Sequence, residues 1–115
     1  MKLPILSLTS IFLLFLACSS PTKNQQSTKV MPTGQTLIAS ADCGSCHQEQ
    51  NKTIGPAYQQ IAAKYPNTAA NQTLLAKSII NGGTGVWGQI PMTPHPNLSQ
   101  KEAEEMVKYI LSLKK

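Results

Sequence analysis

The chain has 115 residues, which leaves room for one domain, and its first third differs in composition from the rest. A folded part of roughly 80 residues buries little apolar surface, so a disulfide, a metal or a cofactor commonly supplements such a core. The ten cations are all Lys and are scattered along the chain, and the formal net charge of +5 (+4 without Lys2) is modest, which argues against a nucleic-acid binder.

Residues 1–17 have the layout of a signal peptide. Lys2 is followed by an apolar run from Ile5 to Ala17, and small polar residues come after it. Thirteen helical residues reach about 20 Å, short of the roughly 30 Å hydrocarbon core, so a permanent transmembrane helix is the weaker interpretation. We therefore expect the chain to be exported.

Cys18 ends the segment Phe15-Leu16-Ala17-Cys18, which resembles the bacterial lipobox. In that motif the cysteine receives a diacylglyceryl group and becomes the mature N-terminus, so the resemblance implies a lipid anchor on the periplasmic side of a bacterial membrane. The alternative is ordinary signal-peptide cleavage, which would leave an unexplained free thiol. Residues 18–33 are mostly Ser, Thr, Lys, Gln, Asn and Pro and predict a flexible tether, with the folded domain at 34–115.

Two short helices are expected at the start of the folded part. After Gly34, the residues Leu37, Ile38 and Ala41 fall on one helical face, which ends at a cysteine motif. Pro56 suits the first turn of a second helix, and Pro66 stops it. The apolar positions of this second helix are Ala57, Tyr58, Ile61, Ala62 and Tyr65.

Two further helices are expected towards the C-terminus. Asn71 is the predicted N-cap of a segment that ends at Gly82-Gly83. Ser99 and Glu102 form a capping box for the last helix. No segment alternates like a strand, so the predicted class is all-α, with a Gly- and Pro-rich loop over 82–96. The predicted apolar faces are Leu74, Leu75, Ser78 and Ile79 in the third helix and Ala103, Met106, Val107, Ile110 and Leu111 in the fourth.

The segment Cys43-Gly44-Ser45-Cys46-His47 has the spacing of a covalent haem-attachment site. Two thiols separated by two residues can reach two vinyl groups on one edge of a porphyrin. The histidine that follows then lies under the ring, where its imidazole can bind iron. The motif predicts one haem c attached through Cys43 and Cys46, with His47 as an axial ligand.

The motif has three other interpretations. A thioredoxin-like redox pair would need a fold with strands, which the sequence does not predict. A zinc site would need a second Cys or His pair, and only His95 remains. A structural disulfide between Cys43 and Cys46 is the third alternative.

Met92 is the predicted second axial ligand. It lies in Pro91-Met92-Thr93-Pro94-His95-Pro96, where the prolines stiffen the backbone and resist helical winding. Met31 falls in the tether and Met106 on the apolar face of the last helix. His95 is the rival ligand in the same loop.

In their order, the motifs of the folded part resemble those of the short class I cytochromes c of bacteria. The resemblance covers about residues 34–115 and implies a small fold of about four helices around one covalently attached haem c. It also implies that the first and last helices cross where Gly34 meets Tyr109. The motifs are Gly34, Cys43 to His47, Ile54-Gly55-Pro56-Ala57, Gly85-Val86-Trp87-Gly88, Ile90-Pro91-Met92 and the helix of Tyr109.

The same resemblance implies the surroundings of the haem. The Pro56 carbonyl would accept a hydrogen bond from the non-ligating nitrogen of His47 and so fix the ring. The Trp87 indole would donate to a haem propionate, and Lys77 would help to neutralise that charge. Ile90 and Pro91 would complete the haem environment. Some relatives have Asn three residues after the axial Met, where this chain has His95.

The expected function is outer-sphere one-electron transfer by a monomer that is not an enzyme. Both axial positions would be filled, by His47 and Met92, and a Met ligand gives a comparatively high potential. The expected partners are redox proteins of the membrane or periplasm. The alternatives are a haem peroxidase or gas sensor with a displaceable Met92, and a dedicated cytochrome subunit of a dehydrogenase.

Overall fold

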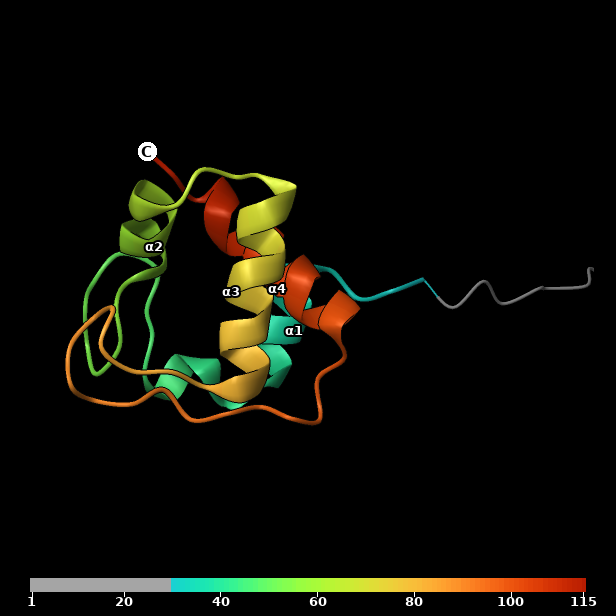
Figure 1. Ribbon diagram of the computed structural model, residues 1–115. Coiled ribbons are helices and arrows are strands. Elements are labelled where there is room, and N and C mark those ends of the chain that lie inside the picture. The colour runs from blue at the N-terminus through green and yellow to red at the C-terminus, as the bar shows by residue number, and fades with distance from the viewer. Residues whose placement is uncertain (1–29) are drawn as a thin grey trace, which may run out of the picture.

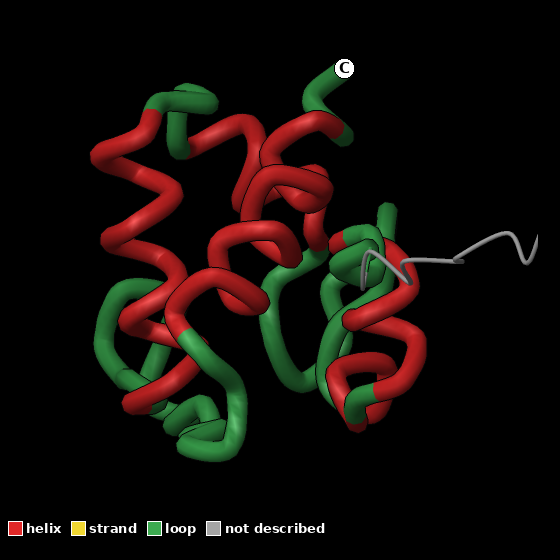
Figure 2. The backbone as a smooth tube through the Cα atoms, turned by 90° about the vertical axis from the view of Figure 1, so that its right-hand side faces the viewer, coloured by secondary structure: helices red, strands yellow, loops and turns green. Residues whose placement is uncertain are grey.

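Four α-helices and one short 3-10 helix make up the fold of residues 30–115, the part of the chain that the computed structural model describes (Figure 1). Residues 30–115 contain no β-strand (Figure 2). They contain one isolated antiparallel β-bridge, between Gly83 and Met92. The predicted all-α class is thus confirmed. The elements are α1 (Gly34–Ser40), η1 (Asp42–Ser45), α2 (Tyr58–Lys64), α3 (Ala69–Asn81) and α4 (Gln100–Ser112).

The last helix, α4, is the centre of the core, because α1, α2 and α3 all pack against it. Its buried side chains lie at the spacing of one helical face, as the sequence predicts. Met106 and Val107 are the largest fully buried side chains in the described residues. The central cluster consists of Leu37, Ala76, Ile79, Ala103, Met106, Val107 and Leu111.

The crossing of α1 and α4 depends on a glycine. A Cβ on Gly34 would meet the backbone carbonyl oxygen of Glu105, and would lie 2.9 Å from Cβ of Tyr109. The close approach of Gly34 and Tyr109 that the family resemblance implies is therefore present. The two helices can pack at this distance only because residue 34 has no side chain.

The helix ends explain where α3 and α4 begin. The predicted capping box of α4 is present: Ser99 Oγ accepts from the Glu102 amide at 3.2 Å, and the Ser99 amide donates to Glu102 Oε2 at 2.9 Å. The prediction that Asn71 caps α3 is wrong. The N-cap is Thr68, whose Oγ1 accepts from the Asn71 amide at 3.3 Å, and the Asn71 side chain donates instead to the Pro66 carbonyl at 2.8 Å.

Two residues of the predicted apolar face of α3, Leu74 and Ser78, are exposed in the structure. Leu74 is 52% exposed, whereas Ala76 is fully buried against the core. The helix begins earlier than its predicted cap, and small Ala76 lets α3 lie close to α4. The buried face is therefore centred on Ala76 and Ile79.

The predicted signal peptide at 1–17, the acylation of Cys18 and the tether up to residue 29 lie outside the described residues. Residues 30–33 are described and precede α1 without helical structure. Among the helices of the described part, none combines the length and apolar character that a membrane crossing requires.

Candidate functional site

A cavity of about 630 Å³ lies between the helices and the two long loops, 46–57 and 82–98. Its size is within the range of small-molecule and cofactor sites. Figure 1 shows both loops on the same side of the helices. The predicted site residues Cys43, Cys46, His47, Met92 and Trp87 all line this cavity, together with Pro56, Ile90 and Pro91.

The 3-10 helix η1 positions the cysteine motif. The amides of Cys46 and His47 donate to the Cys43 carbonyl at 3.2 and 2.9 Å, so the backbone turns tightly between the two cysteines. In such a turn, residues three and four apart project on the same side. Both thiols and the imidazole therefore face the cavity.

The state of the cysteines favours thioether attachment over the other interpretations. Cys43 and Cys46 form no disulfide with each other in the structure. Burial, followed by the neighbouring Asp42 charge, raises the pKa of the Cys43 thiol, whereas a catalytic redox cysteine needs a lowered pKa. No group of three or more potential His, Cys, Asp or Glu metal ligands occurs within residues 30–115.

His47 is held by the loop that follows it. Its Nδ1 lies 2.7 Å from the Pro56 carbonyl oxygen, the contact that the family resemblance implies. With the hydrogen on Nδ1, Nε2 keeps a free lone pair for a metal. The Cys46 carbonyl accepts from the Gly55 amide at 2.8 Å and from Thr53 Oγ1 at 2.7 Å, which fixes the loop against the motif.

Gly55 leaves the room that the His47 ring occupies. A Cβ at this position would meet Cε1 of His47 and would lie 2.8 Å from its Nδ1. We expect Gly55→Ala to lower the free energy of unfolding of the haem-loaded chain by about 1–3 kcal/mol, because the ring or the loop must move. Urea titration measures the loss. Gly83→Ala is the control, since a Cβ there meets no atom within 4 Å; equal midpoints for the two variants would contradict this account of Gly55.

The loop 82–98 presents Met92. Gly82 has a φ of 71°, and a Cβ there would lie 2.5 Å from the Met92 carbonyl oxygen, so this turn requires glycine. The Met92 amide donates to the Gly83 carbonyl at 2.7 Å. Met92 is therefore anchored at the end of α3, with its side chain partly buried against the core at the cavity.

His95, the rival ligand, also lines the cavity, but both of its ring nitrogens have partners. Nε2 lies 3.0 Å from Asp42 Oδ1, and Nδ1 lies 3.3 Å from the Ile79 carbonyl oxygen. The ring is bound to the protein in this arrangement. Within residues 30–115, the sulfur of Met92 has no hydrogen-bond partner of this kind.

The lysine that lies beside Trp87 is Lys64 and not the expected Lys77. Lys77 is exposed on α3 and does not line the cavity, although Ser78 and Ile79 do. The cation beside the indole is Lys64, whose Nζ lies 5.5 Å from the Trp87 ring centroid. This distance is within the range of a cation–π contact.

The lining fits a haem-sized cofactor. Large apolar side chains that are exposed in the protein line the cavity: Ile54, Val86, Trp87 and Ile90. Apolar surface of this extent at one site marks a ligand or a partner. The Tyr58 hydroxyl is buried there without a hydrogen-bond partner, and burial raises the pKa of Tyr58 to about 12, so the hydroxyl keeps a proton to donate. A flat apolar group with polar substituents, attached at two thiols, suits this lining.

Several residues of the site carry no local sequence signal. Tyr58 was expected only as a helix-face residue, yet its ring stacks on His47 with centroids 5.7 Å apart. Lys64 reaches Trp87 from a different helix. Asp42 contacts His95 at the edge of the site. Its only sequence signal is its position directly before the cysteine motif.

Comparisons with known proteins found a matching family model, similar sequences and similar structures. The family model described as "Cytochrome c" matches residues 32–114. The chain is similar to cytochrome c-551 of Ectopseudomonas mendocina, with 42% identity over 82 residues that cover 71% of this chain and 99% of the relative. It is also similar to cytochrome c-552 of Nitrosomonas europaea, with 47% identity over 78 residues, 68% of this chain and 76% of the relative. A crystal structure of the wild-type Nitrosomonas europaea cytochrome c552 matches with a TM-score of 0.65 and 44% identity, over 70% of this chain and 99% of that chain.

Proposed function

Because the chain belongs to the cytochrome c family, as a short monohaem class I member, we propose that it is a one-electron carrier with His47 and Met92 as axial ligands. One haem c is covalently bound, and Cys43 and Cys46 have the spacing that attaches it. The bound haem supplies an iron that gains or loses a single electron. The protein's own residues decide which ligands reach that iron and which partners approach it.

The assignment of His47 and Met92 rests on their contacts. His47 keeps Nε2 free because Nδ1 is bound to Pro56, and such a contact makes the imidazole a better ligand. Met92 comes to the same cavity on a loop fixed by Gly82 and Gly83. His95 is a poorer candidate, since its ring nitrogens face Asp42 and Ile79. A His and Met pair favours ferrous iron and so gives a comparatively high potential.

With both axial positions filled by protein side chains, a substrate would have to displace one of them. The small cytochromes c to which the chain is similar are electron carriers and not enzymes. The charged side chains that line the cavity do not form a catalytic group either. Asp42 is paired with His95, and Lys52 is exposed at the surface.

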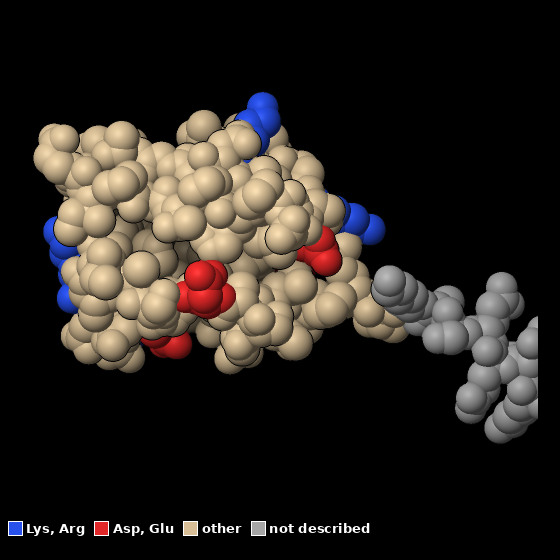
Figure 3. All heavy atoms as spheres, turned by 90° about the horizontal axis from the view of Figure 1, so that it is seen from below, with Lys and Arg blue, Asp and Glu red and all other residues tan. Residues whose placement is uncertain are grey.

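The surface around the cavity suits brief contact with a redox protein. Ile54, Val86 and Ile90 are each more than half exposed at its rim. Seen from below, most of the visible surface is uncharged, with acidic side chains (red) on this face and Lys side chains (blue) at its outline (Figure 3). Electron-transfer encounters use small, weakly held interfaces, and Lys52 and Lys64 beside the apolar rim would steer an acidic partner towards it.

We further propose that the carrier is exported and anchored in a bacterial membrane through acylated Cys18, with residues 18–33 as its tether. The support is the apolar leader that ends at this cysteine. A mass spectrum of the protein from its native membrane tests the anchor. A mass equal to polypeptide plus haem would show that Cys18 is not acylated.

Carbon monoxide tests the carrier against the peroxidase or sensor alternative. We expect the ferrous protein at neutral pH to bind carbon monoxide slowly and incompletely, because Met92 occupies the sixth position. Prompt and complete binding would refute the carrier proposal and favour a displaceable ligand. Co-purification with a dehydrogenase after detergent extraction would instead identify a dedicated subunit.

A further inference from the structure

His95 joins two parts of the molecule that hold the site together. Its amide donates to the carbonyl oxygens of Ile79 and Ile80 at 3.1 and 3.0 Å, in the last turn of α3. Its ring adds the contact between Nδ1 and the Ile79 carbonyl oxygen at 3.3 Å. His95 thereby fixes the loop that follows Met92 onto the end of this helix.

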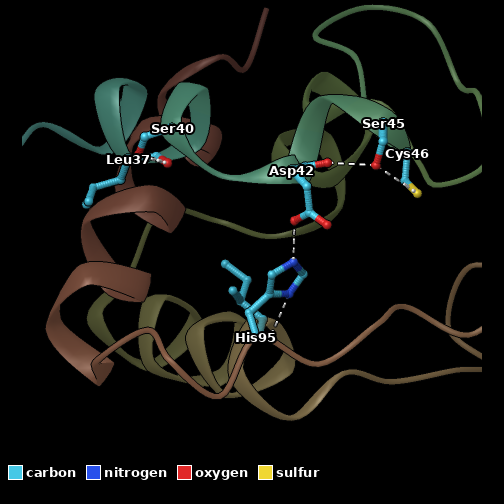
Figure 4. A network of polar contacts seen from close by, with 7 residues as sticks. Leu37, Ser40, Asp42, Ser45, Cys46 and His95 are labelled. Atoms are coloured by element: carbon cyan, nitrogen blue, oxygen red, sulfur yellow. Dashed lines mark hydrogen bonds and ion pairs between the residues drawn. The ribbon is translucent and has the colours of Figure 1, made fainter.

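From this position the His95 ring points to the segment that bears the cysteines, as Figure 4 shows. Nε2 lies 3.0 Å from Oδ1 of Asp42, the first residue of η1. Ser45 Oγ in turn donates to the Asp42 carbonyl at 2.7 Å and lies 3.6 Å from Cys46 Sγ. A continuous polar network runs from the loop of Met92 to the cysteine motif.

The contact between His95 and Asp42 has no counterpart elsewhere in residues 30–115. The other hydrogen bonds of the loop 82–98 stay within the loop or go to α3. Within residues 30–115, the loop of Met92 is therefore hydrogen-bonded to segment 41–47 through this pair alone. The His95 side chain is 20% exposed and that of Asp42 is 76% exposed.

We propose that His95 and Asp42 form a latch that holds Met92 in place, with His95 as the positioning residue and Asp42 as its anchor. The proposal rests on the proposed function, in which Met92 binds the iron of a haem attached to Cys43 and Cys46. A movement of the loop away from the segment that carries the attachment cysteines would take Met92 away from that iron. Because Pro94 stiffens the backbone between them, a restraint on His95 is transmitted to Met92.

Because Asp42 is exposed, we expect the latch to affect local opening of the loop more than global stability. Exposed ion pairs contribute little to global stability. Local openings of a loop, by contrast, depend on the few contacts that the loop makes. We therefore expect the latch to change the rate at which Met92 dissociates while leaving the overall unfolding midpoint nearly unchanged.

The experiment uses the full chain with haem attached, in the ferric state, with imidazole as the displacing ligand. At imidazole concentrations where sulfur dissociation limits the rate, loss of the weak sulfur-to-iron band near the red edge reports that dissociation. We expect Asp42→Ala and His95→Ala each to accelerate it about three- to tenfold, as loss of one hydrogen bond would. The double variant should be no faster than His95→Ala alone, because removing the His95 ring already removes its contact with Asp42.

Glu49→Ala is the matched control, since it removes one exposed carboxylate near the cysteine motif with no hydrogen bond to His95. Equal rates for Asp42→Ala and Glu49→Ala, or rate effects that multiply in the double variant, would overturn the latch. Amide hydrogen exchange at Met92 and His95 gives a readout that does not involve the iron. Exchange there should be faster in Asp42→Ala than in the control, and unchanged exchange would overturn the latch whatever the ligand. A wild-type protein without the red-edge band would refute Met92 ligation instead.

Discussion

Replacing Met92 by Ala is expected to remove the sixth iron ligand and to change the function of the protein. The weak sulfur-to-iron band of the ferric form should vanish. The ferrous form should bind carbon monoxide promptly, because the position is then open. The potential should fall on the order of a tenth of a volt, within the roughly 0.8 V that axial ligation spans. Spectroelectrochemical titration of the haem-loaded chain measures both the band and the potential.

Two methionines give matched controls for this change. Met106 also lines the cavity but is buried in the core, so the near-isosteric Met106→Leu should keep the band. Met31 lies in a separate groove beside Lys101 and Tyr109, and Met31→Ala should keep it too. An unchanged spectrum in Met92→Ala would contradict the assignment and move the sixth ligand elsewhere. His95 would then be tested next, because its ring lines the same cavity.

Replacing Gly34 by Ala is expected to be the most destabilising single substitution of a glycine. The new Cβ would meet the Glu105 carbonyl oxygen and lie 2.7 Å from its carbon, and backbone atoms of a central helix cannot rotate away. Overpacking of this kind costs about 3 kcal/mol, which outweighs the better helix propensity of Ala. Domains of this size have only about 4–12 kcal/mol of stability, so the loss is large. Urea unfolding followed by far-UV circular dichroism measures it.

Gly44→Ala is the control for Gly34→Ala. A Cβ on Gly44 meets no atom within 4 Å, although the residue lies inside the cysteine motif. We expect its free energy of unfolding to stay within about 0.5 kcal/mol of the wild type. If Gly34→Ala were no less stable than Gly44→Ala, the close crossing of α1 and α4 would be wrong. Haem content, measured in parallel, separates a folding defect from a loss of attachment.

The helices and the attachment motif could be predicted because their signals are local. The capping box of Ser99 and Glu102 needs residues only three apart, and the structure has both of its hydrogen bonds. The spacing of Cys43, Cys46 and His47 likewise fixes them on one side of a single turn. The position of Met92 between prolines was another local clue, and the structure brings it to the same cavity.

The N-cap of α3 shows the limit of local reasoning. Asn71 and Thr68 are both good cap residues, and the sequence offers no rule that ranks them here. The choice of Thr68 agrees with the packing of Ala76 and Ile79 against α4, which sets how early the helix must begin. The same packing leaves Leu74 exposed, against the prediction.

By itself, therefore, the sequence determined the helical class, the order of the helices, the covalent haem and the candidate axial residues. Only the tertiary structure decided which distant side chains meet: Asp42 lies 53 residues before His95, and Lys64 reaches Trp87 from another helix. The physical reason is that periodicity and capping depend on neighbours within one or two turns. Contacts between remote residues depend instead on how α3 and η1 are placed around α4, which is decided by the fit of the whole core.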